Sequence, residues 1–453
     1  MQLVAYGAQD VYLTGNPQIT FFKVVYRRHT NFSVECIKQV LEGGSDNLYG
    51  KKVTSTIQRN GDLIHRMHLE TTFTVADQQA ISGNPGTGQI NSVELEIGGQ
   101  LIDKHTGHWL ETYTQLTTPA DLEKPSLHDR RSQLSRKIVE KDFTKINFGF
   151  DTSADLYQKT TASNGVSGFY NESNGSIKTM KYYVPLQFWF CRNIGLSLPL
   201  IALQYHDVKL KFDFARDDLM SFTAGAENIL DSELWVDYIY LDTDERKRFA
   251  QVSHEYLIEQ VQENRKSNNF ESKLLNFNHP VKELIFTGLK ETDPTSIAGI
   301  DANEGVNFDG TRMIHGGKNT PADFYPGISG DNNVSEIFKT TLTLKLNGEE
   351  RFQPRKLIYF TRDQVNDYHS GFGKSLRRKA EDFLTSNNIG VYSFALKPEE
   401  HQPSGTCNFS RIDTAEIVLN GSVQLDCDNI IIYAVNYNVL RIMSGMGGLA
   451  YSN

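Results

Sequence analysis

Residues 182–205 read YYVPLQFWFCRNIGLSLPLIALQY, and Arg192 is the only charged residue in this run. So apolar a run is expected to be buried, because apolar surface is unfavourable in water. Two prolines and a glycine interrupt it, so it cannot form a continuous helix or a membrane span of about 20 apolar residues. We therefore expect two buried strands connected by residues 193–198. Arg192 should lie at that loop or at a subunit contact, paired with a carboxylate rather than buried alone.

The same order of β patterns occurs in both halves of the chain. Apolar and polar residues alternate along 92–97 and again along 341–346, and each run precedes a tight-turn pair, Gly98-Gly99 or Asn347-Gly348. Each half continues with an amphipathic aromatic segment, a later alternating strand and a closing strand rich in β-forming residues. These segments are 109–116, 208–212 and 234–241 in the first half, and 359–368, 415–419 and 430–440 in the second. The repetition indicates a weak internal duplication.

A charged segment, DTDERKRFAQ at 242–251, separates the two halves and is expected to form a helical link. Two segments rich in Gly, Ser, Asn, Asp and Thr, 151–180 and 291–335, are expected to be long surface loops. Many strands with large one-sided insertions predict an all-β protein with two β-sandwiches or jelly rolls in tandem. We expect these two domains to span residues 26–245 and 246–453, after an N-terminal segment of residues 1–25.

The composition argues against several classes of protein. The chain has 46 Lys and Arg against 55 Asp and Glu, and its formal charge of -9 has the wrong sign for general binding to nucleic acid. Its four cysteines lie far apart and lack a CxxC spacing, so neither a zinc site nor a disulfide framework is indicated. The opening residues MQLVAYGAQD lack a basic leader and an apolar stretch of signal-peptide length, so we expect no secretory route.

The motifs for phosphate and dinucleotide binding are incomplete. Gly373-Lys374-Ser375 resembles the end of a phosphate-binding loop, but Tyr368 stands where the first glycine is required. GMGGLA at 445–450 fits the dinucleotide pattern, but too few residues follow to form the helix that would receive a pyrophosphate. We interpret this second motif as a flexible or packed turn. The sequence therefore predicts no catalytic residue and no cofactor.

Histidine pairs give little support for a metal site. His68 and Glu70 share one face of an expected strand and have a spacing that jelly-roll metal sites use. The apolar residues of that strand occupy the opposite face, so we expect an exposed pair without a metal. His105 and His108 flank a glycine and are interpreted as part of a turn.

Other surface motifs are short and scattered. Three basic clusters, 27–29, 246–248 and 377–379, are better explained as solvated faces or subunit contacts than as a nucleic-acid groove. Among the Asn-X-Ser sequons, the candidate surface glycosylation sites are those in the long polar segments, Asn171, Asn174 and Asn333.

Several long motifs resemble one known family. They include LVAYGAQDVYLTGNPQITFFKVVYRRHTNF (3–32), VELEIGGQLIDKH (93–105), VPLQFWFCRNIGLSLPLIALQYHDVKL (184–210), WVDYIYLDTDERKRFAQ (235–251) and YAVNYNVLRIMSGMGGLAYSN (433–453). These strings are similar to the major capsid proteins of nucleocytoplasmic large double-stranded DNA viruses, particularly those that infect algae. The resemblance extends nearly from end to end and is poorest at 77–90, 119–180 and 291–335.

This resemblance implies a double jelly roll, which is two tandem eight-stranded antiparallel β-sandwiches with long surface loops and short helices. It implies a structural protein and not an enzyme, whose chains form homotrimeric capsomers of roughly hexagonal outline that tile an icosahedral shell. The implied partners are further copies of the chain and minor capsid proteins, without specific nucleic acid. The implied location is the virion, after synthesis in the host cytoplasm. We expect residues 1–25, which include Tyr6, Tyr12 and Phe21, to form an arm at the base of the capsomer that contacts neighbouring proteins or the layer inside the shell.

Two rival classes remain open on the residues alone. A carbohydrate-binding or carbohydrate-active β-sandwich protein would display an exposed aromatic platform beside carboxylates. A metal-dependent jelly-roll oxygenase would need His68 and Glu70 to converge with a third ligand.

Overall fold

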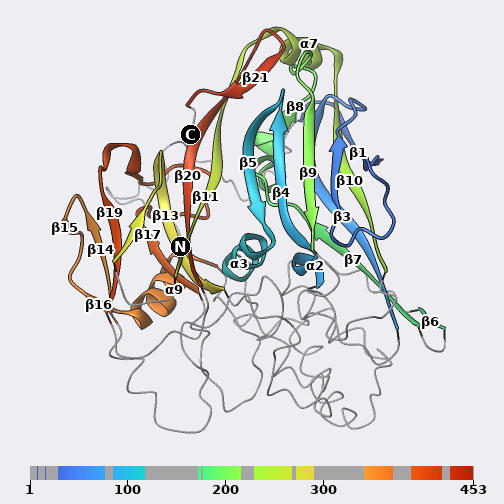
Figure 1. Cartoon of the computed structure of the whole chain (residues 1–453). Coiled ribbons are helices and arrows are strands. Elements are labelled where there is room, and N and C mark those ends of the chain that lie inside the picture. Colours follow the sequence, from blue (N-terminus) through green and yellow to red (C-terminus); the bar gives the residue numbers. More distant parts are fainter. Residues whose placement is uncertain are drawn as a thin grey trace, which may run out of the picture.

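The fold is seen in a computed structural model of the chain (Figure 1). The structure describes residues 29–76, 85–117, 172–174, 177–215, 229–267, 272–289, 341–370, 389–420 and 429–451, together with positions 8 and 16. The N-terminal segment 1–25, the polar segment 291–335 and the glycine-lysine-serine motif at 373–375 therefore lie outside the described residues, apart from those two positions.

The first half of the chain forms two antiparallel sheets that face each other. One has the order β1 (Phe32–Gln39), β10 (Ile229–Leu241), β3 (Leu63–Ala76), β7 (Ile177–Pro185) and β6 (Glu172–Asn174), with β8 (Leu198–Pro199) also paired to β3. The other has the order β2 (Lys52–Thr56), β9 (Val208–Phe214), β4 (Ile90–Ile97) and β5 (Gln100–Thr106). This interleaving of early and late strands is the jelly-roll topology.

The second half repeats the same strand order. Its first sheet contains β11 (His254–Ser267), β20 (Asn429–Met443), β13 (Pro280–Leu289) and β17 (Ile389–Ser393), with β18 (Cys407–Asn408) on β13 and β21 (Met446–Leu449) on β20. Its second sheet contains β12 (Ser272–Leu275), β19 (Ala415–Asn420), β14 (Thr341–Leu346) and β15 (Glu349–Glu350), with β16 (Arg355–Lys356) on β14. The fold is thus a double jelly roll, and the internal duplication predicted from the sequence is confirmed strand by strand.

The two predicted hairpins are the clearest case of this duplication. The turn between β4 and β5 has Gly98 and Gly99 at φ 58° and 84°, and the turn between β14 and β15 has Asn347 and Gly348 at φ 54° and 83°. Positive φ at both central positions is the geometry of the tight hairpin turn that fits the twist of the strands. Glycine and asparagine adopt it at little steric cost.

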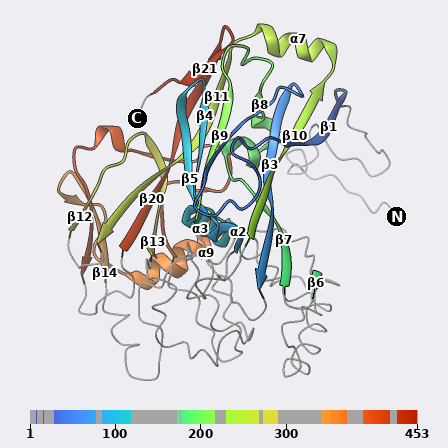
Figure 2. The ribbon, with the colours of Figure 1, turned by 45° about the vertical axis from the view of Figure 1, so that its right-hand side comes forward.

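Short helices occupy equivalent places in the two halves. After β5 comes α3 (Gly107–Thr117), and after β16 come η4 (Tyr359–Asp363) and α9 (Gln364–Tyr368). The predicted helical link is confirmed as α7 (Thr243–Gln251), which connects β10 to β11 at one end of the molecule (Figure 2). The carboxylate of Asp242 accepts a hydrogen bond from the backbone nitrogen of Thr243 at the start of α7. The remaining short helices are α2 (Pro85–Gly88), α6 (Trp189–Arg192), η1 (Ile194–Leu196) and η5 (Phe409–Arg411).

The run 182–205 is largely buried, as predicted, with Ile194 and Tyr205 exposed, but its predicted pair of strands is wrong. The first strand, β7, ends at Pro185, and residues 189–192 then form α6, followed by η1 and the two-residue strand β8. Phe188, Trp189 and Phe190 are consecutive and all buried. A strand would send alternate side chains to opposite faces, whereas a helical turn lets all three enter the core. The prediction that residues 151–180 form a loop is also wrong at the C-terminal end of this segment, because residues 172–174 belong to β6 and residues 177–180 to β7.

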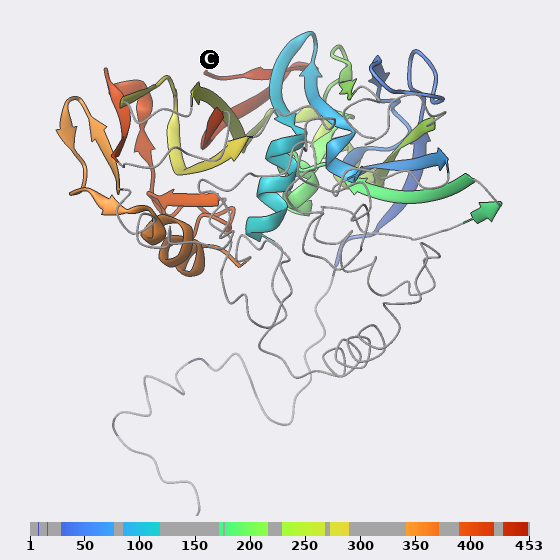
Figure 3. The ribbon, with the colours of Figure 1, turned by 60° about the horizontal axis from the view of Figure 1, so that its bottom comes forward.

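Two apolar cores hold the molecule. The larger fills the first sandwich and continues into residues of the second half, including Ile258, Tyr433 and Val435. The smaller lies between the two sheets of the second sandwich and includes Leu344 and Phe360. The two jelly rolls therefore share buried apolar contacts and stand side by side (Figure 3). None of the helices in the described part of the chain is long and apolar enough to cross a membrane.

Candidate functional site

The most elaborate polar site in the described structure is the junction between the two jelly rolls. Here β5, α3 and α6 of the first jelly roll meet β11, β13 and β20 of the second, and β5 lies beside β11 (Figure 1). The backbone carbonyl of Ile102 on β5 accepts a hydrogen bond from the side-chain amide of Gln260 on β11. The carboxylate of Asp103 accepts one from the backbone nitrogen of Val261 at 3.3 Å. The edge strand β5 of the first jelly roll is thus hydrogen-bonded to the edge strand β11 of the second.

Arg192 supplies the positive charge at this junction. Its Nη2 lies 3.1 Å from Oε2 of Glu259, and the two side chains are only 19% and 7% exposed. Its Nη1 donates to the hydroxyl of Tyr113, 3.2 Å away. The prediction that Arg192 is paired with a carboxylate is confirmed, and the partner belongs to the other jelly roll of the same chain.

Glu259 is held by a second cation. The Nζ of Lys282 on β13 lies 2.8 Å from its Oε1 and also donates to the carbonyl of Pro398 at 2.6 Å. Burial acts to raise the pKa of Glu259, but Arg192 and Lys282 outweigh it and hold the pKa below its usual value. Glu259 therefore stays ionised, flanked by the buried Lys282 and the half-buried Arg192.

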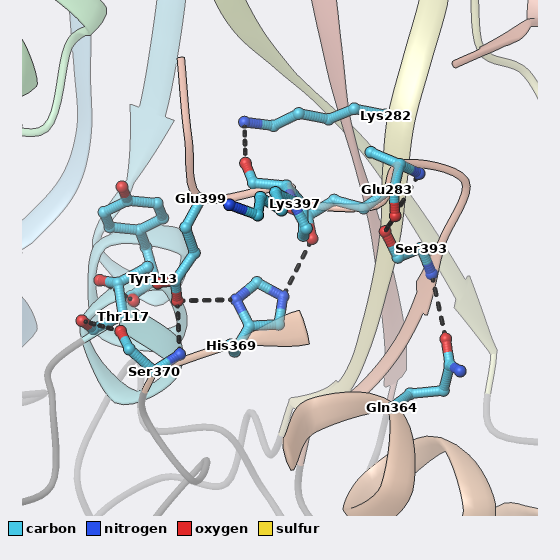
Figure 4. A network of polar contacts seen from close by, with 12 residues as sticks. Tyr113, Thr117, Lys282, Glu283, Gln364, His369, Ser370, Ser393, Lys397 and Glu399 are labelled. Atoms are coloured by element: carbon cyan, nitrogen blue, oxygen red, sulfur yellow. Dashed lines mark hydrogen bonds and ion pairs between the residues drawn. The ribbon is translucent and has the colours of Figure 1, made fainter. Parts of the chain in front are cut away.

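A second network centres on His369, next to the first (Figure 4). The imidazole Nε2 lies 3.0 Å from Oε2 of Glu283, and Nδ1 lies 3.1 Å from Oε1 of Glu399. Burial acts to lower the pKa of His369, but the two carboxylates overcome it and raise the pKa to about 9. The ring is therefore an imidazolium at neutral pH and donates from both nitrogens.

The two networks are linked to each other and to the first jelly roll. Lys282 and Glu283 are neighbours at a bulge in β13, while Pro398 and Glu399 are neighbours in the segment that follows β17. Ser370 donates its backbone N–H to Glu399 at 2.9 Å and its hydroxyl to the carbonyl of Thr117, the last residue of α3, at 2.9 Å (Figure 4). The two networks therefore connect the first jelly roll to the second at two places. At one end α3 is bonded to Ser370, and at the other Glu259 on β11 is paired with Arg192 on α6.

His105 and His108 also lie in this junction. The interpretation of this pair as part of a turn is wrong, because His105 belongs to the strand β5 and His108 to the helix α3. The ring of His105 on β5 stacks on Phe188 with centroids 4.6 Å apart, and its Nε2 lies 2.9 Å from Oδ2 of Asp103. His108, on α3, has Nδ1 2.7 Å from the hydroxyl of Tyr433 and Nε2 3.2 Å from the carbonyl of Gly288. Burial lowers the pKa of His108 to about 4. A neutral His108 therefore donates from Nε2 to the carbonyl and accepts from the tyrosine.

The C-terminal hairpin of β20 and β21 forms a further connection across the junction. The backbone nitrogen of Tyr205 donates to the carbonyl of Gly445 at 2.9 Å, and the backbone nitrogen of Leu449 donates to the side chain of Gln100 at 3.2 Å. Gly445 has φ +81°, and a Cβ there would lie 2.5 Å from the ring of Tyr205. The motif GMGGLA is thus packed against the first jelly roll, but only Gly445 belongs to the turn, because residues 446–449 form β21. The interpretation as a turn is therefore wrong for most of the motif.

The predicted metal pair lies on a different surface. His68 and Glu70 occupy the outer face of β3 but are half-buried rather than exposed, because β3 is an inner strand and the ring of His68 lies against Tyr183. Burial lowers the pKa of His68, while Asp237 and Glu70 act to raise it. Among the described residues, no group of three or more His, Cys, Asp or Glu side chains is placed to hold a metal ion.

The other predicted surface motifs are only partly described. Arg246 on α7 is exposed and pairs with Asp62 at 2.9 Å. Asn174 is the last residue of β6, whereas Asn171 and Asn333 lie outside the described residues. The sequence interpretation did not single out Glu259, Lys282 or His369, since nothing in their local pattern distinguishes them from surface charges.

The chain matches known sequences over nearly its whole length. Residues 20–242 match a family described as major capsid protein N-terminus, and residues 245–448 match one described as large eukaryotic DNA virus major capsid protein. The chain is 46% identical to the major capsid protein of Pyramimonas orientalis virus, across 100% of this chain and 99% of that protein. It is 40% identical to the major capsid protein of Paramecium bursaria Chlorella virus 1, with the same coverage.

Solved structures agree with the sequence relatives. A quasi-atomic model of the PBCV-1 virus capsid is 34% identical, with a TM-score of 0.66 over 96% of this chain and 100% of that chain. The Faustovirus major capsid protein shares the fold at 14% identity, with a TM-score of 0.60 over 97% of this chain and 94% of that one. The chain therefore belongs to the major capsid proteins of large eukaryotic DNA viruses, which are structural proteins of the virion shell and not enzymes.

Proposed function

We propose that three copies of this chain form a capsomer of roughly hexagonal outline, and that many such capsomers tile an icosahedral shell. The observation that carries this proposal is the buried junction. The Arg192–Glu259 pair and the shared apolar core join the two jelly rolls of one chain, and Lys282 holds Glu259 from within the second jelly roll. Three chains, each with two joined and similar jelly rolls, can close a ring of six similar jelly rolls.

The proposed domain limits are 26–245 and 246–453, with residues 1–25 as an arm. The position of α7 between the last strand of the first jelly roll and the first strand of the second supports this division. So does the change from one matched family to the other between residues 242 and 245. We propose that the arm contacts neighbouring proteins or the layer inside the shell.

The remaining proposals concern partners and location. Minor capsid proteins would bind between capsomers, and the chain would be made in the host cytoplasm before it enters the virion. We propose no specific binding to nucleic acid, because the net charge of -9 opposes general attraction to the packaged genome. Asn171, Asn174 and Asn333 are proposed as surface glycosylation sites.

Native mass spectrometry of the purified full-length chain tests the capsomer. We expect one species with three times the 51.3 kDa mass of a single chain, which persists at micromolar concentration. Negative-stain images of the same sample should show hexagonal particles. A folded monomer at this concentration would refute the proposal. Removal of residues 2–20 tests the arm, which is expected to be needed for complete, stable particles but not for the trimer.

A further inference from the structure

The C-terminal residues 444–451 of the second jelly roll lie against the first. They comprise the turn after β20, the strand β21 and the two residues that follow it, and we name them the clasp. Ser444 and Gly445 have φ 53° and 81°, the geometry of a tight hairpin turn, so β21 folds back on β20 in a defined direction. The clasp lies at the end of the molecule where α7 connects the two jelly rolls (Figures 1 and 2).

We propose that the clasp closes over the first jelly roll and thereby holds the two jelly rolls in the docked orientation from which the capsomer is built. Of its eight residues, Gly447 alone is buried, so the clasp can open without unfolding either sandwich. It therefore has a closed and an open state. The inference rests on the proposed trimer only in its last step, the entry of the closed chain into a capsomer.

Hydrogen bonds to His206 hold the middle of the clasp. His206 precedes β9 in the first jelly roll, and its Nδ1 lies 3.0 Å from the carbonyl oxygen and 3.2 Å from the backbone nitrogen of Gly447. The ring nitrogen donates to the carbonyl in one tautomer and accepts from the N–H in the other, so the ring bonds to Gly447 in both. Together with the bonds to Tyr205 and Gln100, these contacts attach the clasp to three residues of the first jelly roll.

Glycine at two positions of β21 lets the clasp approach this closely. A Cβ at Gly447 would lie 2.6 Å from Cδ2 of Leu203 and 3.3 Å from Cγ2 of Ile97, which are both buried core residues. A Cβ at Gly448 would lie 3.0 Å from Oε1 of Gln100. Carbon atoms in van der Waals contact are about 3.5–4.0 Å apart, so a larger side chain at Gly447 would push the clasp away from the first jelly roll.

The first jelly roll holds His206 in position for this contact. Arg59 donates to the carbonyl oxygens of Gln204 at 2.8 Å and of His206 at 3.3 Å. Gly98 donates its backbone N–H to the carbonyl of Asp207 at 3.0 Å, and a Cβ at Gly98 would overlap the ring of His206. Gly98 is therefore required for the position of His206 as well as for the hairpin turn. The surface that receives the clasp is formed within the first jelly roll.

The end of the clasp is linked to the polar junction. The side-chain nitrogen of Asn438 on β20 donates to the carbonyl of Tyr451 at 3.0 Å and to Oε1 of Gln260 at 2.9 Å. Gln260 in turn donates to the carbonyl of Ile102 in the first jelly roll. Opening of the clasp removes one of the bonds that orient Asn438, and Asn438 orients Gln260 across the junction. We therefore expect the junction to loosen when the clasp opens.

Hydrogen–deuterium exchange of the full chain, followed by mass spectrometry, tests the clasp. Gly447→Val prevents the close approach by its size, whereas His206→Ala removes the hydrogen-bonding ring and leaves the clasp itself unchanged. In both variants we expect exchange at residues 100–106 and 254–263 to increase by about tenfold or more, as expected for the loss of one or two hydrogen bonds. Residues 341–346, in the other sheet of the second sandwich, should exchange as in the unmodified chain.

Two further variants are matched controls. His206→Asn retains a hydrogen-bonding group near the position of Nδ1, so it should keep most of the protection of residues 254–263. Ala450→Val adds bulk at an exposed residue of the clasp and should leave exchange at the junction unchanged.

The pattern of exchange decides the inference. Exchange at residues 254–263 that is the same in the unmodified chain, Gly447→Val and His206→Ala would refute it. An equal increase at residues 341–346 would also refute it, because that pattern indicates a general loss of stability and not a loss of docking. An increase confined to the two sides of the junction supports it.

Native mass spectrometry tests the entry into the capsomer. The Gly447→Val trimer should dissociate at a protein concentration about tenfold or more above that at which the unmodified trimer dissociates. A Gly447→Val chain that stays trimeric at the same dilution as the unmodified chain would overturn the inference and leave the proposed trimer standing. If the unmodified chain is a folded monomer, the proposed function fails, and the exchange experiment still decides whether the clasp holds the junction.

Discussion

Arg192 and Glu259 form an ion pair of 3.1 Å between the two jelly rolls, and Arg192 lies in an otherwise uncharged stretch of its own half. The only charge in the run 182–205 therefore has its partner in the other sandwich. Glu259 also has a cation in its own half, Lys282, whereas Arg192 has this carboxylate partner only when the jelly rolls are docked. Correct docking is therefore required to bury Arg192 without a large desolvation cost. The pair favours one relative orientation of the two sandwiches over others.

Arg192→Met should destabilise the folded chain by about 3–5 kcal/mol, the range for removal of one partner from a buried ion pair. Urea unfolding of the full chain measures this loss. Arg441→Met is the matched control, because Arg441 pairs with Glu255 at 2.9 Å but both side chains are at least half exposed. The control should lose less than about 1 kcal/mol. Equal losses in the two variants would show that the junction pair contributes no more than a surface pair.

Stability should fall between about pH 6.5 and pH 9 because of His369. Its pKa is raised to about 9 in the folded chain by Glu283 and Glu399, against an ordinary value of 6.5. The folded state therefore binds the proton more tightly, and the stabilisation is complete below pH 6.5 and lost as the pH rises through 9. The full effect is about 3 kcal/mol. His369→Gln should flatten this part of the stability profile, and Glu399→Gln should move its upper limit to lower pH. A profile that is the same with and without His369 would contradict this assignment.

His108 should produce the opposite dependence in acid. Its pKa is lowered to about 4 by burial, so the unfolded chain binds a proton near pH 6.5 that the folded chain does not accept until near pH 4. Stability should therefore decrease as the pH falls through this interval, by at most about 1.4 kcal/mol per pH unit. His108→Gln keeps hydrogen-bonding groups near Tyr433 and Gly288 but cannot titrate. The difference between the two unfolding profiles from pH 6.5 to pH 4 isolates this contribution, and no difference would exclude it.

Gly390→Ala should destabilise the second jelly roll by about 1–3 kcal/mol, the usual cost of an overpacked core. A Cβ at this position on β17 would lie 2.1 Å from Cε2 of Phe286, which is 3% exposed and cannot move into solvent. The double variant Gly390→Ala, Phe286→Leu should lose less than the sum of the two single variants, because the smaller side chain relieves the clash. Thermal unfolding of the four chains gives the comparison, and strictly additive losses would argue against a direct clash.

The sequence predicts most of the fold because its patterns are local. Alternation along β4 and β14 and the paired turns at 98–99 and 347–348 depend only on neighbouring residues, and both hairpins form as predicted. Residues 186–196 are different, since their charge-poor composition indicates burial but not the kind of element. There the tertiary need to bury three consecutive aromatic side chains favours a helical turn over a strand.

The polar contacts of the junction could not be predicted from local sequence patterns, because their partners are far apart in the sequence. Glu283 and His369 are 86 positions apart in sequence and meet only when β13 and the residue after α9 are both in place. Lys282 lies at a β-bulge, where the register with β20 shifts, and no periodic pattern marks such a position. The burial of Arg192 could be read from its apolar neighbours, but the identity of its partner could not.

The hairpin of β20 and β21 has a consequence for biosynthesis. Both sheets of the first jelly roll are complete at Leu241, whereas the segment that bonds to Tyr205 and Gln100 begins more than 200 residues later. A ribosome adds about 5–20 residues per second, so the first sandwich emerges about 10–40 s before the strands that cover its flank. During that interval its side of the junction is exposed, and this is the period in which a nascent chain most needs protection from aggregation.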